Sequence, residues 1–422
     1  MMHRVVVTGM GVVAPNGITI TDFNTALQQG ISGLHHIPQL QEWAMGCQVA
    51  AYPKAYNREV LYPYLSAGVL KSLRSSCIAY ALTAALEAWN QAGLPISKEQ
   101  YLPHVGCIMG NSACDVDHMR YAIQECEELR GNQFGVRHIE QLMASGGSAY
   151  IGGVLGLGNR VTSNSSACST GTESIIMAYE HIKLGNATMM VAGSSEASSP
   201  YMWSIFDAMR VCNRNHNHEP TKASRPMSID SAGFIAGSGA AALVLETYDS
   251  AISRGATILA EITAGTINSG GQRNGGTMTA PSATSVVHCI RNTVQQAGIQ
   301  PHNIDLICGH LTGTFADKLE IANWATALQL SPIHMPYINS AKGLIGHCIS
   351  AAGSIECVAA LLQLQHNYIH ANANLTALQP EITAHVAPEK IPTSTLTKQL
   401  NTVIKANFGF GDVNSCIIFK KV

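Results

Sequence analysis

The chain has 422 residues, of which 46% are hydrophobic and 12% are charged, and its formal net charge at pH 7 is −2. This balance excludes a protein that binds nucleic acid through a basic surface, and the low charged fraction indicates that another subunit covers part of the surface. No uninterrupted apolar run reaches about 18 residues, so we expect no transmembrane helix. Because residues 1–8 read as a strand and not as a signal peptide, we expect a cytoplasmic protein.

The first predicted strand leads into Gly9-Met-Gly11-Val-Val-Ala14, which matches the Gly-x-Gly-x-x-Ala pattern of dinucleotide sites. Pro15-Asn16-Gly17 follows at once and would stop the helix that a pyrophosphate requires. A tight turn at the end of a central strand is therefore the better interpretation of this motif.

Strands and helices alternate along the chain, which favours an α/β architecture. In the first half we expect helices at 21–30 and 66–92, strands at 104–109, 188–192 and 240–246, and a polar cap or dimer insertion at 115–143. In the second half we expect strands at 258–267, 305–308 and 337–339, helices at 283–297, 317–328 and 348–366, and a hairpin at 401–420. Since Ser163–Cys168 and Ile338–Lys342 are similar and both precede a helix, we predict two duplicated halves, residues 1–256 and 257–422.

Cys168 is the first candidate for chemistry. It follows the small residues Ser166 and Ala167 and precedes a stretch with helical spacing of apolar residues, which Gly185 would cap. At a helix start, the unsatisfied N–H groups and the helix dipole favour a thiolate, so we expect a cysteine nucleophile. A buried structural cysteine is the alternative.

The remaining cysteines and one histidine pair give no sign of a metal. The twelve cysteines include no Cys-x-x-Cys pair, so we expect reduced thiols and neither a zinc ribbon nor a dithiol site. His216-x-His218 lies in an Asn- and His-rich segment without partner ligands, which favours a surface loop. We therefore predict that no metal is bound.

Two histidines lie at predicted strand and helix ends in the second half. His310 follows a buried strand, and His347 precedes a helix. Catalytic groups in α/β sheets gather at the carboxyl ends of strands, so we expect both histidines to face Cys168. A cysteine that holds an acyl group and two imidazoles that stabilise an enolate suit chemistry on thioesters. Taken singly, each histidine is better explained as a core or loop residue, and only the set supports this function.

With these residues, the chain resembles a β-ketoacyl-acyl-carrier-protein synthase of the elongating type (types I and II) from end to end. The motifs that carry the resemblance are, in chain order, Val5–Gly11, Ser166–Gly171, Ala223–Pro226, Met278–Pro281, Lys342 with Gly346-His347, Ala351–Gly353 and Asn407–Gly411. The resemblance implies a thiolase fold, in which two duplicated βαβαβαββ halves stack as five layers, αβαβα.

The resemblance also implies roles for single residues. Cys168 would accept the acyl chain, while His310 and His347 would act in malonyl decarboxylation and condensation. Glu356 would hold Lys342 near the histidines. The backbone N–H groups of Cys168 and Phe410 would form an oxyanion hole, and Phe410 would also gate the acyl pocket. The other implied contacts are with the pantetheine arm, through Thr279, Thr312, Thr314 and Phe408, and with an acidic acyl carrier protein, through Arg210, Lys71 and Arg74.

The implied reaction is the decarboxylative Claisen condensation of a Cys-bound acyl chain with malonyl-acyl carrier protein in fatty-acid elongation. It gives 3-oxoacyl-acyl carrier protein and CO2. No cofactor is expected, because phosphopantetheine arrives on the carrier protein. We expect a homodimer, with a heterodimer of related subunits as the alternative, and neither nucleic acid nor a membrane as a partner.

The chain departs from the family pattern at several positions. Leu311 and Gly313 follow His310 where His-Gly-Thr-Ser-Thr is usual, Ala232 replaces an Asp, and Asp412 replaces the second Gly after Phe410. These changes leave the shape of the pantetheine tunnel open. They favour, as the alternative function, a specialised ketosynthase of a polyketide- or polyene-type pathway, with or without a non-catalytic partner subunit.

Two other classes remain as alternatives. A structural subunit that only shapes a partner's pocket is disfavoured because Cys168 is present. A thiolase that acts on coenzyme A would need a second cysteine on a glycine-rich loop, and Cys416 instead lies within the last predicted strand.

Overall fold

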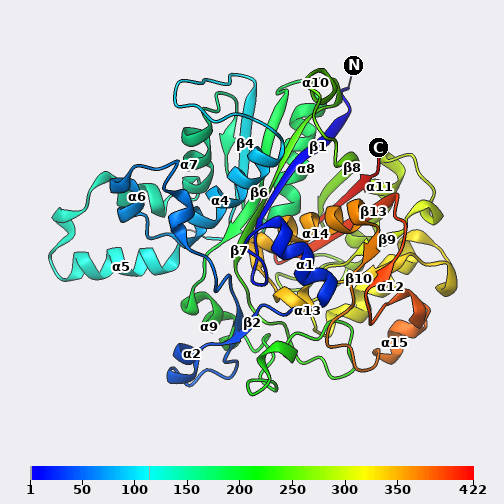
Figure 1. Ribbon diagram of the computed structural model, residues 1–422. Helices are drawn as coiled ribbons and strands as arrows, with labels where there is room; N and C mark the ends of the chain where they lie inside the picture. The colour runs from blue at the N-terminus through cyan, green and yellow to red at the C-terminus, as the bar shows by residue number, and fades with distance from the viewer. Residues whose placement is uncertain (1, 114) are drawn as a thin grey trace.

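The computed structural model describes residues 2–113 and 115–422 and contains a ten-stranded mixed sheet (Figure 1). Five neighbouring strands come from the first part of the chain, in the spatial order β5 (Val161–Thr162), β4 (Val105–Gly110), β6 (Met189–Glu196), β7 (Gly239–Thr247) and β1 (Val5–Val13). The other five come from the second part, in the order β8 (Ala260–Ser269), β14 (Val413–Lys420), β13 (Thr402–Gly409), β9 (Leu306–Cys308) and β10 (Tyr337–Asn339).

The two sets of five strands have the same topology. In the first set, β5, β4 and β6 are parallel, and β7 runs antiparallel to both β6 and β1. In the second set, β10, β9 and β13 are parallel, and β14 runs antiparallel to both β13 and β8. The sets meet where β1 pairs antiparallel with β8, with Val5 opposite Ile262. The duplication predicted from the sequence is therefore present in the strand order.

Helices cover both sides of each half-sheet. The pair α4 (Ser76–Gln91) and α7 (Gly146–Leu155) packs on the outer face of the first half, and α11 (Ala283–Gln296) with α12 (Ala316–Leu328) covers the second. Between the halves, α8 (Thr170–Lys183) packs directly against α14 (Ala352–His366). The result is the predicted five-layer α/β arrangement of a thiolase fold.

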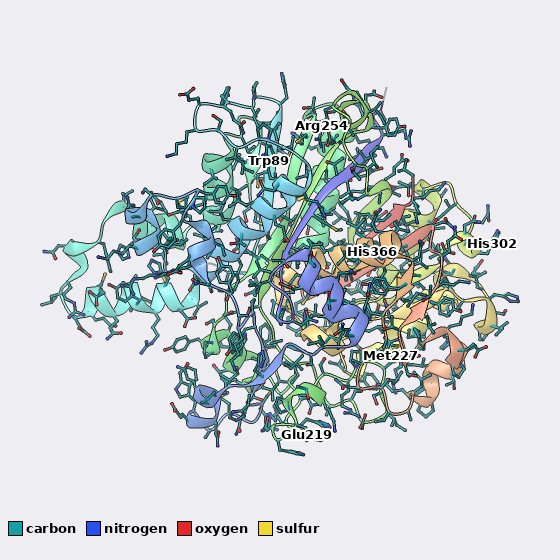
Figure 2. The ribbon with its side chains drawn as sticks, viewed as in Figure 1. Trp89, Glu219, Met227, Arg254, His302 and His366 are labelled. Atoms are coloured by element: carbon teal, nitrogen blue, oxygen red, sulfur yellow. The ribbon has the colours of Figure 1, made fainter. Side chains whose placement is uncertain are left out.

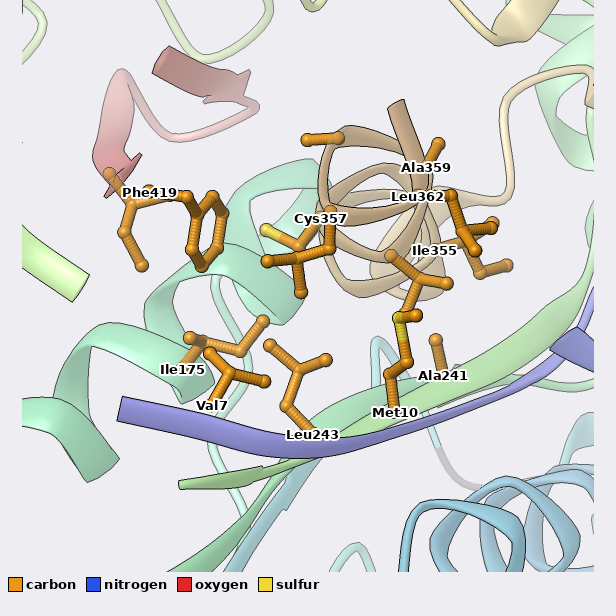
Figure 3. Close-up of a cluster of buried hydrophobic side chains, with 14 of the residues drawn as sticks. Val7, Met10, Ile175, Ala241, Leu243, Ile355, Cys357, Ala359, Leu362 and Phe419 are labelled. Carbon is orange, nitrogen blue, oxygen red and sulfur yellow. The ribbon is translucent and has the colours of Figure 1, made fainter. Parts of the chain in front are cut away.

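The central layer consists of two apolar helices, one from each half, that cross at a glycine. Side chains of β1, β7, α8 and α14 meet in one apolar cluster, which includes Val7, Leu243, Ile175 and Ile355 (Figure 3). The helices approach so closely that a Cβ on Gly171 would lie 2.4 Å from the backbone nitrogen of Ser354. Only glycine fits at such a crossing, so α8 and α14 can begin side by side.

The helix predicted at 66–92 is interrupted, because polar groups bind the backbone at residues 73–75. The structure has α3 (Ala67–Ser72), a short break, and then α4. Ser75 caps α4 by accepting the N–H of Ile78, and Gln141 accepts the N–H groups of Arg74 and Ser75. At the far end of α4, the buried Trp89 (Figure 2) donates its indole N–H to the backbone of a following loop residue.

The remaining elements surround this framework. The predicted insertion at 115–143 forms α5 (Val116–Glu127) and α6 (Val136–Leu142), which project from one side of the molecule (Figure 1). The smaller elements are α1 (Ile20–Gln29), β2 (Leu34–His36), α2 (Pro38–Glu42), β3 (Val49–Ala51), α9 (Pro200–Ala208), α10 (Tyr248–Ser253), α13 (Lys342–Ile345), β11 (Tyr368–Ile369), α15 (Pro380–Thr383) and β12 (Leu396–Thr397). The proposed boundary at 256/257 falls between α10 and β8 and stays a prediction. Among the described residues, no helix is long and apolar enough to cross a bilayer.

Candidate active site

Cys168 lies in the 3₁₀ turn Ala167–Ser169 that connects β5 to α8. The turn begins with Ala167 in a left-handed conformation, at φ +48°. Thr170 fixes it from the helix side, since its hydroxyl donates to the carbonyl of Ala167 at 2.7 Å and accepts the N–H of Ser166 at 2.8 Å. The sulfur is thus held at the start of α8, as the sequence predicts, with Cys168 9% exposed.

The protonation state of Cys168 differs from the expectation. Burial raises the pKa of the Cys168 thiol to about 11, although the positive charge of Lys342 and a hydrogen bond from the Phe410 backbone act to lower it. At neutral pH the resting side chain is therefore a thiol and not a thiolate. The prediction from the helix start considered only local dipoles, and the desolvation of this buried site outweighs them.

His347 and His310 both reach the sulfur. His347 Nε2 lies 3.1 Å from Cys168 Sγ, and the two imidazole rings meet edge to face with their centroids 5.2 Å apart. One nitrogen of each ring and the sulfur lie within 4.8 Å of one another. The three candidate residues, which the sequence analysis identified in separate segments, therefore lie together around one point.

Both imidazoles are neutral at physiological pH. Burial, reinforced by the charge of Lys342, lowers the pKa of His347 to about 3. The same two causes lower the pKa of His310 well below its ordinary value. On His347, Nδ1 accepts the backbone N–H of Ile349 at 3.2 Å, so the ring proton lies on Nε2, the nitrogen that faces Cys168.

A buried cluster of three charged side chains lies behind the histidines. Lys342 Nζ forms an ion pair with one oxygen of Glu356, as the resemblance implies, and Lys405 Nζ lies 2.7 Å from the other oxygen. Burial alone would raise the pKa of Glu356, but the two ammonium groups reverse the effect and lower it. Lys405 was not predicted, because a single lysine within the apolar strand Val403–Ala406 gives no local signal of a partner.

Two carboxyl groups of α12 hold the loop that carries His310. Asp317 accepts the backbone N–H groups of Thr312 and Gly313, and Glu320 accepts those of His310 and Leu311, all at 2.7–3.1 Å. Burial raises the pKa of Asp317 to about 6 and that of Glu320 to about 7. The sequence analysis missed both residues. The clue was acidic residues in the first turns of a predicted helix, directly after the histidine loop.

A cavity of about 590 Å³ opens onto Cys168 and the two histidines. The residues expected to bind the pantetheine arm all line it, namely Thr279, Thr312, Thr314 and Phe408. The hydroxyls of Thr312 and Thr314 are 2.9 Å apart. The lining is mostly apolar and includes Met202, Phe206 and Phe234, which suits an acyl chain.

Phe410 lies at the β13–β14 turn, partly exposed, and lines the cavity. Its backbone N–H points toward Cys168 Sγ and lowers the pKa of the thiol, which agrees with the expected oxyanion donor. Gly409 is required beside it, since a Cβ there would lie 2.9 Å from the carbonyl of Ser166 and 3.2 Å from the nitrogen of Cys168. The turn is thus packed against the nucleophile.

Asp412, one of the departures, fixes this turn to a neighbouring loop. It is fully buried at φ +61°, and its carboxylate accepts the backbone N–H groups of Gln272 at 3.0 Å and Ser282 at 2.8 Å. A Cβ on Gly270 would lie only 2.1 Å from this carboxylate. The acidic residue therefore links the turn of Phe410 to the loop that carries Thr279.

The other departures have simple packing explanations. Leu311 is fully buried among the apolar side chains beneath α12. Gly313 has φ +78°, and its carbonyl accepts the N–H of Gly233, which follows Ala232. This sequence thus packs the histidine loop directly against the Ala232–Gly233 segment.

The three basic residues expected to bind a carrier protein lie at different places. Arg210 is exposed and precedes Val211, which lines the cavity. Arg74 instead lies 4.2 Å from the ring centre of Tyr121 on α5, and Lys71 lies on α3. Neither Lys71 nor Arg74 lines the cavity. Of the three, only Arg210 is next in sequence to a residue that lines the cavity.

The donor atoms of Cys168, His310 and His347 are also of the types that bind Zn²⁺, and their spacing would allow a metal ion. Each already has a protein partner, however: the sulfur meets His347, and Nδ1 of each imidazole meets an N–H group. The expected absence of a metal stays a prediction.

Comparisons with known proteins identify the family. Residues 2–251 match the model of the beta-ketoacyl synthase N-terminal domain, and residues 259–376 match that of the C-terminal domain. The chain belongs to the beta-ketoacyl synthase family. It is an acyltransferase of that class, as the sequence predicts.

Relatives and solved structures cover the whole chain. The 3-oxoacyl-[acyl-carrier-protein] synthase 2 of Coxiella burnetii is 31% identical over 100% of this chain and 99% of its own length. Synthase 1 of Escherichia coli K12 is 29% identical, with full coverage of both chains. A beta-ketoacyl synthase from Burkholderia phymatum superposes with a TM-score of 0.90 at 28% identity, again with full coverage of both. A ketosynthase assembly with the acyl carrier protein of a type II polyketide synthase superposes with a TM-score of 0.86 at 25% identity and full coverage.

Proposed function

We propose that the protein elongates acyl chains on an acyl carrier protein, with Cys168 as nucleophile and His310 and His347 as the groups that stabilise the enolate. The overall reaction converts an acyl thioester, malonyl-carrier protein and one proton into 3-oxoacyl-carrier protein, CO2 and free carrier protein. The observation that carries the proposal is the convergence of the sulfur and two neutral imidazoles within 4.8 Å at one cavity.

In the first step, Cys168 Sγ attacks the carbonyl carbon of the incoming acyl thioester. A new C–S bond forms, the bond to the pantetheine sulfur breaks, and the thiol proton passes to the departing pantetheine. The backbone N–H groups of Phe410 and Cys168 stabilise the negative oxygen that develops. The direction of the Phe410 N–H toward the sulfur supports this role.

In the second step, malonyl-carrier protein places its thioester oxygen against the two imidazoles. The bond to the carboxylate breaks, CO2 leaves, and the electron pair forms an enolate whose negative oxygen the histidines stabilise. The enolate carbon then attacks the acyl-Cys168 carbonyl, a C–C bond forms, and the Cys168 sulfur leaves and takes up a proton. Neutral histidines suit this task because they donate a hydrogen bond without attracting the malonyl carboxylate itself.

The expected partners are an acyl carrier protein and a second copy of this chain. Thr279, Thr312 and Thr314 line the cavity that would hold a pantetheine arm, and the exposed Arg210, which precedes the lining residue Val211, would contact an acidic carrier protein. Large apolar side chains exposed on the projecting helices support a homodimer through this region, namely Ile123 on α5 and Val136 and Ile139 on α6. The cytoplasmic location and the absence of a cofactor stay predictions.

One observation favours the alternative of a specialised ketosynthase. Asp412, which departs from the family pattern, is fully buried and links the turn of Phe410 to the loop that carries Thr279. It leaves the nucleophile and histidines in place, so the condensation chemistry is the same in both pathways. The difference would lie in the acyl chains that the cavity accepts.

The test is a mass-spectrometric assay of the purified protein with acyl-carrier proteins of increasing chain length. We expect an acyl adduct on Cys168, its loss in Cys168→Ala, and loss of CO2 release from malonyl-carrier protein in His310→Ala and His347→Ala. Elongation by Cys168→Ala would overturn the proposal. Product masses obtained with carrier proteins of fatty-acid and polyketide type would distinguish the two pathways.

A further inference from the structure

A buried amide connects His310 to the charged cluster. Asn407 Nδ2 lies 3.0 Å from His310 Nδ1 and donates to Glu356 Oε2 at 3.2 Å. On its other side, Asn407 Oδ1 accepts a hydrogen bond from the hydroxyl of Thr172 at 2.7 Å. Asn407 and Thr172 are fully buried, so no solvent competes for these bonds.

The contacts allow only one orientation of the amide. Glu356 is ionised, because the ammonium groups of Lys342 and Lys405 lower its pKa, and an ionised carboxylate only accepts hydrogen bonds. The side of Asn407 that faces Glu356 must therefore be the NH2 group. Its second proton points at His310, whose Nδ1 must then be the acceptor.

We infer that Asn407, held by Glu356, Lys405 and Thr172, is a positioning residue that fixes the neutral tautomer of His310 with its proton on Nε2. His347 has the same tautomer by a different route, since a backbone N–H occupies its Nδ1. Both rings therefore present an Nε2–H to the cavity. In each ring, an N–H donor at Nδ1 therefore places the ring proton on Nε2.

Lys405 has a defined part in this arrangement. Lys342 already pairs with one oxygen of Glu356, and Lys405 pairs with the oxygen that also accepts the Asn407 amide. Both lysines are fully buried, and no other lysine is, within the part of the chain described. The second cation orients Glu356 Oε2 and keeps it unprotonated, which is the condition for the amide orientation above.

The consequence for chemistry rests on the proposed function. A thioester oxygen between the two rings would receive two N–H donors from neutral imidazoles, which stabilises an enolate without a proton transfer. The opposite tautomer of His310 would direct a lone pair at the oxygen and repel it. The amide thus matters for the decarboxylation step and not for acyl transfer to Cys168.

The first test observes the tautomer in the intact wild-type enzyme. Protein labelled with ¹⁵N in its histidine rings is examined by two-dimensional ¹H–¹⁵N NMR, and the His310 signals are identified by their loss in His310→Ala. We expect a protonated Nε2 and an unprotonated Nδ1 between about pH 6 and 8. A proton on Nδ1, or an imidazolium, in the wild-type enzyme would overturn the inference.

The second test reverses the polarity of the contact. Asn407→Asp has the same shape but lacks the amide N–H that faces His310. A proton taken up by the new carboxyl group would be shared with the neighbouring Glu356 oxygen and would not be directed at His310. We expect the His310 proton to move to Nδ1 and malonyl decarboxylation to fall by at least about 100-fold, which is the direction known for a wrong tautomer. Acyl transfer to Cys168 should stay within about threefold of the wild-type rate.

The variant Lys405→Met tests the second cation. It should lower the rate of decarboxylation by about tenfold, and a wild-type rate of decarboxylation would remove Lys405 from the inference.

Asn414→Asp is the matched control. Asn414 is a buried asparagine of the same β13–β14 hairpin, opposite Phe408, and it contacts Asn268 and Ser285 instead of a histidine. Its replacement buries a carboxylate but should leave the His310 tautomer unchanged. If His310→Ala decarboxylates at the wild-type rate, the proposed function fails. If His310→Ala is inactive but Asn407→Asp leaves tautomer and rate unchanged, only the inference fails.

Discussion

The two halves of the molecule share one topology, but equivalent positions in the two halves carry different side chains in different surroundings. The central helices α8 and α14 each begin after a 3₁₀ turn, Ala167–Ser169 and Ile349–Ala351, and the first residue of each turn has φ +48°. Cys168 is second in the first turn, and Ser350 is second in the other. Ser350 is fully buried and hydrogen-bonded to Glu196, whereas Cys168 faces a cavity. The duplicated backbone therefore provides two equivalent positions, and the surroundings make one of them a nucleophile.

The buried glutamates show the same contrast. Glu196, at the end of β6, is bonded to the hydroxyls of Ser112 and Ser350 and has no ion-pair partner among the described residues. Burial raises its pKa to about 7. Glu356, on α14, meets two ammonium groups, which lower its pKa. Equal burial thus gives opposite pKa shifts for the two glutamates, because only Glu356 has cationic partners.

The largest expected effect concerns the two equivalent turns. Cys168→Ser should lower condensation by more than about 10³-fold, because the hydroxyl is a far weaker nucleophile in a site without a strong base. Adding Ser350→Cys should not restore activity, since that position faces Glu196 and not the cavity. Acyl-adduct mass spectrometry and product assays check both variants. An adduct at residue 350 would mean that the halves are less distinct than the structure shows.

The next largest effect concerns the contribution of the two buried glutamates to stability. Glu356→Gln leaves the ammonium groups of Lys342 and Lys405 buried without a counter-charge, and we expect it to lower the free energy of unfolding by about 3–5 kcal/mol. Urea unfolding followed by circular dichroism measures the change. Glu196→Gln at pH 7 is the matched control, and equal losses in the two variants would contradict the difference in charge environment.

The contact between the halves can be broken at a glycine. Gly171→Ala would place a Cβ 2.4 Å from the nitrogen of Ser354, so α8 and α14 must move apart. We expect a loss of about 2–3 kcal/mol in unfolding free energy. The control is Gly153→Ala in α7, where nothing lies within 4 Å, and a gain of about 0.5–1 kcal/mol is expected there. Similar thermal melting of both variants would contradict the close crossing.

The smallest expected effect is a pH dependence from Glu196. Its pKa is about 7 in the folded protein and about 4.3 in an unfolded chain, so between these values only the folded state holds the proton. The free energy of unfolding should therefore fall as pH rises through this window, with no further change from this group above it. Glu196→Gln removes the contribution, and the decline between about pH 5 and 8 should shrink by about 1–2 kcal/mol. Asp317 and Glu320, whose pKa values are also raised, keep part of the slope. Parallel curves for variant and wild type would exclude this role.

The sequence by itself determined the features that are encoded locally. The strand and helix order, the small residues around Cys168, and the histidines beside strand ends are all visible in short segments, and together they indicated the family and the fold. The pairing of Lys342 with Glu356 was implied by the family resemblance, and the structure contains this ion pair. Helix 66–92 was divided by Ser75 and Gln141, a cap and a distant amide that local periodicity does not reveal.

Only the tertiary structure decided which groups share a buried environment. Lys405 and Asn407 lie in an apolar strand, Glu196 ends another, and nothing near them in sequence shows that they meet Glu356, His310 or Ser350. The thiol state of Cys168 was missed for the same reason, since the helix start is a local feature while desolvation depends on everything that surrounds the sulfur. Charge and protonation in this protein depend on contacts between residues far apart in the chain, which patterns within single segments do not contain.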